Sequence, residues 1–538
     1  MDVIQRAQDW LSQDPDPATR DELQHLIDAG DTAELEDRFA ERLQFGTAGL
    51  RGALGAGPNR MNRVIVAQAA AGLAAYLLEH GTSPSVVVGY DARHNSDVFA
   101  RDTAEIMEGA GVHAFLLPTH LPTPVLAFAI RHLGCSAGVM VTASHNPPQD
   151  NGYKVYLEDS SQIVPPADAD ISATIDAVGR VDEMPRSDAY EILGPEVAEA
   201  YVEAVVALPA ADGPRDVVAV YTPMHGVGRD TLVEAVSRAG FPPLHVVAEQ
   251  GDPDPDFPTV AFPNPEEPGA MDLALKRASE VGADIIVAND PDADRCAVGV
   301  RDGESYRMLT GDQVGALLAE HLLRRGREGT YGSSIVSSDL LGRQAAAHGQ
   351  PWEQTLTGFK WLGKIPTLVF GYEEALGYSV APDIARDKDG VSAIITVLEL
   401  ATALKADGRT LIDLLDDVYR RHGLHATSQL SVRVEDLSII SRAMDVLRTS
   451  PPTELGGLSV TSVDDLADGY RGLPPTDGIR LGLDGGARII CRPSGTEPKL
   501  KCYLEVVVDV TESIDVARAS ADEQLAAIKT DLATALGI

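Results

Sequence analysis

Short apolar segments of strand length alternate with longer segments of helical period along the first third of the chain. Apolar runs at 85–89, 113–117 and 137–141 are separated by helical patterns, of which 64–79 and 98–110 are the clearest. Strands that alternate with helices pair in parallel, because each helix carries the chain back across a face of the sheet. Runs that are apolar throughout indicate strands buried on both faces. This part of the chain therefore predicts an α/β domain.

The alternation is interrupted and then restarts, which predicts several domains. A Pro-, Gly- and Ala-rich segment at 208–214 has the composition of a linker, and from about residue 430 the pattern becomes that of an α+β domain with a terminal helix. The chain has 538 residues, which exceeds what a single core accommodates. The expected domains are 1–210, 211–306, 307–428 and 429–538. Later elements are expected as strands at 217–221, 245–247, 284–288 and 334–337, and as helices at 230–239 and 312–325.

The composition narrows the classes of partner. Lys and Arg number 44 against 81 Asp and Glu, which gives a formal net charge of −37. Such a surface repels nucleic acid and anionic membranes, so we expect neither as a partner. The first eleven residues lack the basic start and apolar stretch of a signal peptide, so we expect none. The sequence contains no apolar segment of membrane-spanning length and has four scattered cysteines with no CxxC pair. We expect a cytoplasmic protein that is a monomer or a homodimer.

An acidic loop follows the expected strand at 284–288. Asp290, Asp292 and Asp294 occupy alternate positions in the sequence DPDADR, where they can converge on one hard cation. An acidic surface turn is the alternative interpretation. An EF-hand is excluded, because Arg295 stands where its glycine is required and Arg301 where its glutamate is required. Three carboxylates leave the coordination shell of Mg²⁺ incomplete, so a phosphorylated group is expected nearby.

A serine loop follows the expected strand at 137–141. In TASHNP, small residues and a proline turn would leave the hydroxyl of Ser144 exposed, and a serine can store a phosphoryl group as a monoester. The monoester would also give the metal its missing oxygen. His145 is placed to hold or move a proton. The alternative is an ordinary polar turn at the end of a strand.

Two further loops contain groups that suit a phosphorylated sugar. RPSGTEPK presents an Arg fork, hydroxyls and a glycine amide, which together form a phosphate cradle; these are Arg492, Ser494, Gly495 and Thr496. In GYEEALGY, the carboxylates of Glu373 and Glu374 could accept hydrogen bonds from sugar hydroxyls. A polar hairpin turn and a solvated acidic loop are the respective alternatives.

Together these motifs resemble the α-D-phosphohexomutase family, in its branch of phosphoglucomutases and phosphopentomutases. TASHNP, DPDADR, GYEEALGY and RPSGTEPK occur in the family order and span nearly the whole chain. FGTAGLRG with Arg51, NGYK with Lys154, TGFK at 357–360 and DKDG with Lys388 also fit. The resemblance implies three similar α/β domains, with mixed or parallel sheets, and a C-terminal α+β domain arranged around a deep central cleft.

The resemblance also implies a reaction and a set of roles. Phosphorylated Ser144 would give its phosphoryl group to a sugar monophosphate, and the resulting sugar 1,6-bisphosphate would return its other phosphoryl group. One Mg²⁺ would be held by Ser144 and the three aspartates, while Arg51, Lys154 and Arg295 would stabilise charge. The general base stays open among Lys154, His145 and Lys388. The substrate-binding residues implied are Thr357, Gly358, Lys360, Glu373, Arg492, Ser494, Gly495 and Thr496.

Sugar preference and reaction class each have competing interpretations. Hexose-specific relatives often carry Glu-x-Ser, whereas this chain has Glu373, Glu374 and Ala375. Glucose 1-phosphate is the first choice, with pentose, mannose and glucosamine phosphates behind it. A phosphatase with an aspartyl nucleophile shares the strand followed by DxDx, but its next residue is Thr or Val, and here it is Asp294. Near matches to nucleotide-binding loops at 358–364 and 226–228 are incomplete and are rejected.

Overall fold

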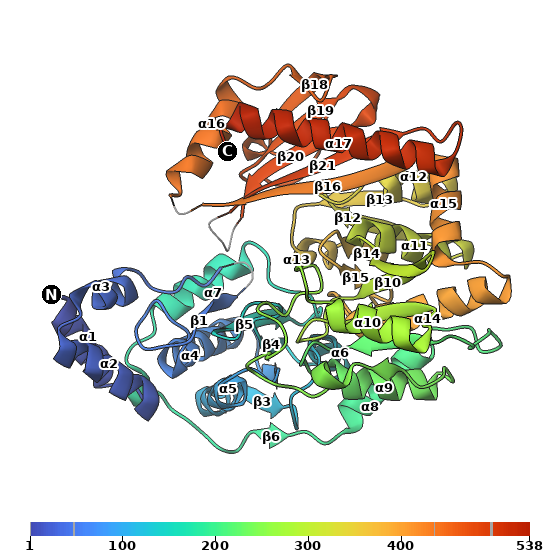
Figure 1. The fold of residues 1–538 in the computed structure, drawn as a ribbon. Coiled ribbons are helices and arrows are strands. Elements are labelled where there is room, and N and C mark those ends of the chain that lie inside the picture. Colours follow the sequence, from blue (N-terminus) through green and yellow to red (C-terminus); the bar gives the residue numbers. More distant parts are fainter. Residues whose placement is uncertain (1, 47–48, 435, 495–498) are drawn as a thin grey trace. The chain divides into compact units, whose positions relative to one another are not determined.

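The computed structural model describes residues 2–46, 49–434, 436–494 and 499–538, and within them the chain forms two compact units. The first unit comprises Met1–Leu309 and Gly377–Asp407, and the second comprises Thr310–Leu376 and Gly408–Ile538. The described strands form four sheets, distributed along the chain as the colours of Figure 1 show.

The first sheet of unit 1 has the strand order β1-β5-β4-β2-β3-β6. Strands β4, β2, β3 and β6 are parallel, whereas β5 runs antiparallel to both β4 and β1. The strands are β1 (Leu50–Ala53), β2 (Ser85–Tyr90), β3 (His113–Leu116), β4 (Ala137–Val141), β5 (Asp150–Leu157) and β6 (Glu191–Ile192). The helices are α1 (Val3–Leu11), α2 (Pro17–Ala29), α3 (Thr32–Ala40), α4 (Arg63–His80), α5 (Ser96–Ala110), α6 (Thr123–Leu133), α7 (Ala167–Asp176) and α8 (Glu196–Val206).

Helices cover both faces of this sheet, as the apolar strands predict. Successive side chains of a strand point to opposite faces. Val86 and Val88 therefore pack into one core with Phe99 of α5, while Val87 packs into a separate core with Leu126 of α6. An uninterrupted apolar strand is stable here because each face has its own helical layer.

The second sheet of unit 1 has the order β11-β10-β9-β7-β8. Strands β9, β7 and β8 are parallel, and β10 returns antiparallel to β9 directly after the acidic loop. The elements are β7 (Ala219–Thr222), α9 (Gly228–Arg238), β8 (His245–Val246), α10 (Asp272–Val281), β9 (Ile285–Ala288), β10 (Ala297–Asp302) and β11 (Ser305–Met308). Unit 1 also contains β15 (Gly377–Ser379), which is not a strand of this sheet, and α14 (Gly390–Ala406).

Unit 2 contains a parallel α/β sheet and an antiparallel sheet. In the first, β13, β12 and β14 are neighbours in that order; in the second the order is β16-β21-β20-β19-β18-β17, with α17 running along it (Figure 1). The α/β elements are α11 (Gly311–Arg324), β12 (Thr330–Ser334), α12 (Leu340–Ala347), β13 (Trp352–Thr355), α13 (Phe359–Leu362), β14 (Leu368–Glu373) and α15 (Leu411–His422). The remaining elements are β16 (Leu424–Arg433), α16 (Ser438–Thr449), β17 (Glu454–Leu455), β18 (Leu458–Asp465), β19 (Ile479–Leu483), β20 (Arg488–Pro493), β21 (Lys499–Val508) and α17 (Ile514–Leu536). Short 3₁₀ helices lie at Val181–Glu183, Ala248–Gln250, Leu466–Asp468 and Asp484–Gly486.

The expected fold class is confirmed, with one misplaced strand. The four sheets are α/β in the first three cases and antiparallel with flanking helices in the last. The strand expected at 334–337 is wrong, because β12 ends at Ser334. Ile335 and Val336 instead turn away and pack against Leu466 and Ile490 of the C-terminal sheet. Their apolar character reflects this contact rather than a strand. The four domain limits and the shared cleft stay predictions.

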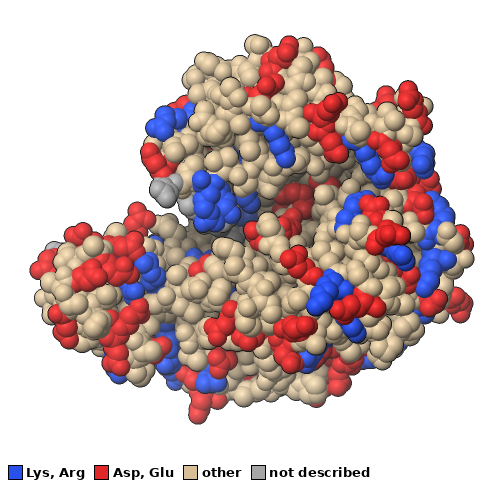
Figure 2. All heavy atoms as spheres, viewed as in Figure 1, with Lys and Arg blue, Asp and Glu red and all other residues tan. Residues whose placement is uncertain are grey.

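The surface is acidic, as the composition indicates. Figure 2 shows Asp and Glu side chains scattered over the whole face in view, with Lys and Arg between them. Among the described helices, none combines the length and the apolar character needed to cross a membrane. Cys135, Cys296, Cys491 and Cys502 are buried free thiols.

Candidate active site

Ser144 stands in a tight loop at the carboxyl end of β4. The backbone of Ser144 has a φ of 52°, a left-handed conformation that few residues other than glycine adopt. Its N–H donates to the side-chain oxygen of Thr142 at 2.9 Å, which closes the turn. This local strain points the serine hydroxyl out of the strand direction.

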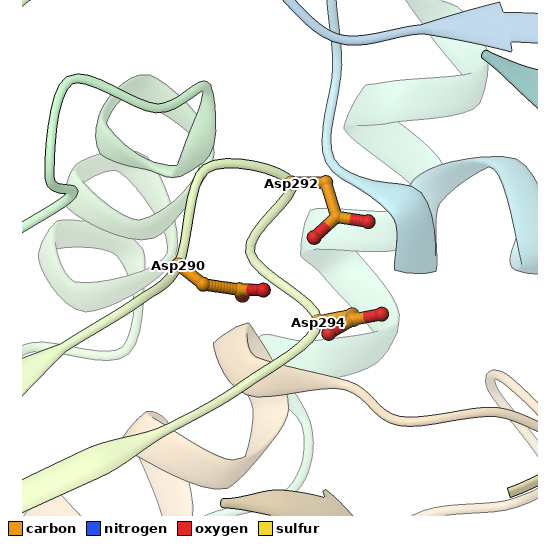
Figure 3. Close-up of side chains that lie close together, drawn as sticks. All are labelled: Asp290, Asp292 and Asp294. Carbon is orange, nitrogen blue, oxygen red and sulfur yellow. The ribbon is translucent and has the colours of Figure 1, made fainter. Parts of the chain in front are cut away.

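The three aspartates lie on the loop that joins β9 to β10. One carboxylate oxygen of each lies within 4.8 Å of the other two, and all three residues are completely buried. Figure 3 shows that Asp290, Asp292 and Asp294 lie at successive points of this one loop and that their carboxylates are close together. Ala293 has a φ of 55°, which bends the chain so that residues two apart can face the same point. The sequence spacing therefore produces the expected convergence.

The serine loop and the acidic loop meet. Ser144 Oγ donates to Asp290 Oδ2 at 2.9 Å, although the two residues are 146 positions apart. The expectation of an exposed hydroxyl is wrong, because Ser144 is only 2% exposed. The acidic loop of the second sheet covers it, and this covering could not be deduced from the local sequence TASHNP.

Lysines neutralise part of the charge of the clustered carboxylates. Lys154 Nζ, from β5, lies 2.7 Å from Asp292 Oδ2 and 2.8 Å from Asp294 Oδ2. Lys388 Nζ, from the segment before α14, lies 2.6 Å from Asp294 Oδ2. Burial alone would lower the pKa of Lys154, but the two carboxylates hold that pKa above its ordinary value. Lys154 is therefore a fixed positive charge in this arrangement.

The carboxylates differ in how readily they ionise. Burial, followed by the charges of Asp294 and Asp292, raises the pKa of Asp290 to about 8. Burial opposes ionisation of Asp294 as well, but Lys154 and Lys388 hold its pKa well below the usual range. Burial and mutual repulsion therefore oppose the charge on Asp290, whereas the lysines stabilise the charge on Asp294.

The donor set fits a hard divalent cation. Within the described part of the chain, Asp292 Oδ1 and Asp294 Oδ1 are buried oxygens that lack a hydrogen-bond partner. Buried carboxylate oxygens without partners are costly, and coordination to a cation removes that cost. Oxygen ligands at this density are those that Mg²⁺ prefers. Residues Asp290, Asp292 and Asp294 are the ones that could hold such an ion.

His145 is neutral and has a defined tautomer. Its pKa is well below the ordinary value because the ring is buried and because Arg295, Arg51 and Lys388 lie near it. An Arg295 N–H points at Nε2 at 3.4 Å, so Nε2 accepts and Nδ1 carries the hydrogen. Nδ1 lies 3.1 Å from Ser144 Oγ and can donate to it, while that hydroxyl donates to Asp290.

Two arginines line the same loops. The backbone N–H of Arg295 donates to Asp290 Oδ1 at 3.0 Å, and its Nε lies 3.7 Å from Asp290 Oδ2. Arg51, from β1, donates to Asn146 Oδ1 at 3.3 Å. The predicted site residues of the first unit thus lie on segments that contact one another; they are Arg51, Ser144, His145, Lys154, Asp290, Asp292, Asp294, Arg295 and Lys388.

Arg93 supports the serine loop and was missed in the sequence. Its buried guanidinium donates to the backbone oxygens of Ser144 at 2.6 Å, Pro147 at 2.8 Å and Asp150 at 3.1 Å, and also contacts that of Asn146. Asp91 lies 3.3 Å from Arg93 Nε. The sequence offered one signal, because the charged residues Asp91 and Arg93 come directly after the apolar strand β2. Charged residues beside a buried strand are seldom buried unless they are paired.

The predicted substrate residues of unit 2 that the structure describes lie on two parts of the chain. Glu373, at the end of β14, accepts from the N–H of Gly358 at 2.7 Å, and Thr357 and Lys360 belong to the same short segment that follows β13 and enters α13. Arg492 lies near the end of β20, and the N–H of Ser494 donates to Lys499 O at 2.8 Å. The side chains of Glu373, Arg492 and Ser494 are half-buried. Gly495 and Thr496 lie outside the described residues.

Family models match four successive parts of the chain. Residues 42–181, 199–303 and 310–422 match the phosphoglucomutase/phosphomannomutase alpha/beta/alpha domains I, II and III, and residues 442–523 match the C-terminal domain of the same description. The order agrees with the order of the four sheets.

Several known sequences are similar over almost their full length. A "Probable phosphomannomutase" of Haemophilus influenzae is 51% identical, over 86% of this chain and 96% of the relative. A "Phosphoribomutase" of Saccharomyces cerevisiae is 36% identical, over 92% and 91%, and a "Phosphoglucomutase" of Staphylococcus haemolyticus is 35% identical, over 91% and 95%. A solved structure of a candidate phosphomannomutase from Thermus thermophilus matches with a TM-score of 0.71 and 28% identity, over 90% of this chain and 99% of that one.

Proposed function

Because this chain belongs to the phosphoglucomutase/phosphomannomutase family, within the α-D-phosphohexomutase superfamily, we propose that it interconverts a sugar 1-phosphate and the matching sugar 6-phosphate. The observation that carries this proposal is the 2.9 Å contact between Ser144 Oγ and Asp290 Oδ2. Through this contact, a hydroxyl that can accept a phosphoryl group adjoins a cluster of carboxylates and lysines. We further propose a cytoplasmic enzyme, monomeric or homodimeric, whose substrate is a sugar monophosphate.

The proposed reaction has two phosphoryl transfers. Ser144 carries the phosphoryl group, and the free hydroxyl of the bound sugar monophosphate attacks the phosphorus and loses its proton to a base. The bond from Ser144 Oγ to phosphorus breaks, and a sugar 1,6-bisphosphate results. After the sugar reverses its orientation, the Ser144 oxygen attacks the other phosphorus, and the bond from that phosphorus to the sugar oxygen breaks. The sugar oxygen takes back the proton from the base, and a rearranged monophosphate leaves. The same bisphosphate, supplied from outside, would restore an enzyme that has lost its phosphoryl group.

The neighbouring charges suit this chemistry. Asp290, Asp292 and Asp294, with an oxygen on Ser144, would hold one Mg²⁺ per chain, and that ion supplies positive charge against the transferring oxygens when bound. Arg51, Arg295 and the ammonium groups of Lys154 and Lys388 would orient the phosphoryl oxygens.

The general base stays open among His145, Lys154 and Lys388. A base must be unprotonated before it can accept the proton of the attacking hydroxyl. His145 is neutral, with a pKa well below the ordinary value, but its Nδ1 hydrogen faces Ser144 and its Nε2 accepts from Arg295, so the ring would have to leave Arg295 before it could take a proton. The carboxylates keep Lys154 protonated by holding its pKa above the ordinary value. Lys388 is paired with a carboxylate of the acidic loop.

Unit 2 would recognise the rest of the substrate. Arg492, Ser494, Gly495 and Thr496 would bind the phosphate that is not reacting, because a guanidinium fork and hydroxyls match its oxygens. Glu373 would accept hydrogen bonds from sugar hydroxyls, with Thr357, Gly358 and Lys360 beside it. The contact between Glu373 and the Gly358 N–H supports a single sugar-binding surface.

For the sugar, we propose glucose, with a phosphopentomutase as the second candidate. Ala375 favours the second candidate, because hexose-specific relatives often carry a serine there that can bind one more hydroxyl. The names of the similar proteins include a phosphoglucomutase, a phosphomannomutase and a phosphoribomutase, so the family alone leaves the sugar open. A phosphatase with Asp290 as nucleophile is less favoured, since that carboxylate already accepts the hydroxyl of Ser144.

Steady-state kinetics on two substrates tests this choice. Turnover of glucose 1-phosphate and ribose 1-phosphate is compared as kcat/KM, with each reaction primed by the matching bisphosphate. The proposal predicts a larger kcat/KM for glucose 1-phosphate. A hundredfold preference for ribose 1-phosphate, about 2.7 kcal/mol in transition-state stabilisation, would replace glucose with pentose as the substrate.

A further inference from the structure

We infer that Thr123 is a positioning residue for the cation site, since it orients Asp292 so that one carboxylate oxygen is left for the ion. This inference rests on the proposed function, because it presumes that the acidic loop binds a divalent cation. It extends that function to a residue of α6, an element that contains none of the predicted site residues.

Thr123 makes two hydrogen bonds to the same aspartate. Its hydroxyl donates to Asp292 Oδ2 at 2.6 Å, and its backbone N–H donates to Asp292 O at 2.9 Å. Thr123 and Asp292 are both completely buried and lie 169 positions apart. One contact fixes the backbone of the acidic loop, and the other fixes the side chain that this backbone carries.

These bonds divide the oxygens of Asp292 between two uses. Oδ2 accepts from the Thr123 hydroxyl and from Lys154 Nζ at 2.7 Å. Among the described residues, no hydrogen-bond donor reaches Oδ1, although this oxygen is buried. Two donors on one oxygen fix the plane of the carboxylate, and the second oxygen then points in a set direction. Groups that orient a metal ligand in this way commonly control metal affinity.

The position of Thr123 in its helix strengthens this interpretation. Thr123 is the first residue of α6 and follows the N-cap position, from which a threonine hydroxyl often bonds the backbone of its own helix. Pro122 occupies the N-cap position, and no side chain caps the first turn of α6. The Thr123 hydroxyl therefore bonds outside its helix, to a candidate cation ligand.

Two substitutions separate the hydroxyl from the shape of the side chain. Thr123→Val keeps the branched shape and the backbone N–H but removes the hydroxyl, and Thr123→Ser restores the hydroxyl. Mn²⁺ and Mg²⁺ dissociation constants are measured on the full chain after chelator treatment, by titration calorimetry without substrate. We expect Thr123→Val to weaken binding about 10- to 100-fold and Thr123→Ser to stay within about threefold of the unsubstituted protein.

Thr402→Val is the matched control. Thr402 is 1% exposed and lies in α14 of the same unit. Its hydroxyl donates to backbone oxygens of its own helix, Leu398 O at 3.0 Å and Glu399 O at 2.9 Å, and within the described residues it has no other hydrogen-bond partner. Both valine variants lose a buried hydrogen bond, so both should lose some thermal stability. We expect only Thr123→Val to lose cation affinity.

The possible outcomes test the inference and the proposed function separately. If the unsubstituted protein binds neither cation, the proposed cation site fails. If it binds them and Thr123→Val binds equally well, or if Thr402→Val is weakened as much, the positioning role of Thr123 is wrong. Loss of affinity in Thr123→Ser as well would assign the effect to the methyl group and also overturn the inference. Should Thr123→Val fail to fold, Thr123→Ala removes the hydroxyl without adding volume and carries the same expectation.

Discussion

The acidic and serine loops of unit 1 contrast with the substrate loops of unit 2. Ser144 and the three aspartates are almost completely buried and are held by lysines, arginines and backbone donors. In unit 2, Glu373 and Arg492 are half-buried. Groups that act on a transferring phosphoryl group must be fixed in position before the reaction. Groups that bind a sugar phosphate must stay accessible to a ligand that enters from solvent. The proposed function would thus place the reaction at buried groups of unit 1 and the recognition of the substrate at more open groups of unit 2.

Of the predicted effects, loss of the serine hydroxyl should be the largest. A small effect would contradict the contrast between the buried groups of unit 1 and the more open groups of unit 2. Ser144→Ala should lower kcat by about four orders of magnitude or more, because the group that stores the phosphoryl is lost. Ser333→Ala, a buried serine of β12, is the control and should retain activity. The measurement is kcat together with a thermal melt. Near-normal turnover by a folded Ser144→Ala protein would remove the serine from the mechanism.

Removing a charge from the proposed substrate-binding groups of unit 2 should act on binding rather than on chemistry. Arg492→Ala should raise KM for the sugar monophosphate by about 10- to 100-fold, the effect of losing a charge-assisted hydrogen bond to phosphate. We expect kcat to change by less than about threefold. Arg442→Ala, at an exposed position of α16 in the same unit, should leave both constants unchanged. An unaltered KM in Arg492→Ala would dismiss the phosphate-binding role.

Displacing the acidic loop tests whether its rigidity matters. A Cβ at Gly226 would lie 2.4 Å from Pro291 Cα and 2.5 Å from Pro291 O, and the N–H of Val227 donates to that same Pro291 O at 2.9 Å. Gly226→Ala must therefore push the loop that carries Asp290 and Asp292, at a cost of about 1–3 kcal/mol in stability. We expect kcat to fall about tenfold.

Gly179→Ala is the matched control for this loop displacement. A Cβ at Gly179 would have no atom within 4 Å, so kcat and stability should both stay near those of the unsubstituted protein. Equal kinetics in the Gly226 and Gly179 variants would show that the acidic loop tolerates displacement, and the contrast between the buried groups of unit 1 and the more open groups of unit 2 would weaken.

The smallest predicted effect concerns the pH dependence of unit 2. Burial, followed by the charges of Glu373 and Asp312, raises the pKa of Glu374 to about 7. A carboxyl with a raised pKa in the folded state binds more protons there than in the unfolded state, so its contribution to stability falls as the pH rises from about 4.5 to 7. Glu374→Gln should therefore gain thermal stability relative to the unsubstituted protein between pH 5 and pH 8, by a few degrees. Melting curves of both proteins at pH 5 and pH 8 check this prediction. If the difference in melting temperature between the two proteins is the same at both pH values, the prediction is wrong.

Much of the site follows from strand ends in the sequence. Ser144 and the aspartates each follow an apolar run, and polar residues at the carboxyl ends of strands in open α/β sheets commonly form ligand sites. The sequence predicted a phosphorylatable group near the aspartates, and Ser144 Oγ does lie 2.9 Å from Asp290 Oδ2. The neutralisation of Asp294 by Lys154 and Lys388 was not expected, because these side chains lie 140 and 94 positions away along the chain.

The residues that were missed act over long distances. Thr123 and Arg93 have no local motif that links them to the loops they contact, and only the fold brings them there. The misplaced strand has a similar cause. Ile335 and Val336 look like strand residues, but their apolar side chains serve a contact with residues much later in the chain, in the C-terminal sheet. Sequence patterns specify elements and loops well, whereas contacts between sheets have no signal of fixed spacing.

The most direct test of the account is to locate the stored phosphoryl group. The dephosphorylated full chain is incubated with Mg²⁺ and ³²P-labelled glucose 1,6-bisphosphate, digested, and analysed by mass spectrometry. The account predicts an acid-stable phosphoester on the peptide that contains Ser144, and transfer of that label to sugar monophosphate. A labile acyl phosphate at Asp290, or turnover without any label on Ser144, would contradict it.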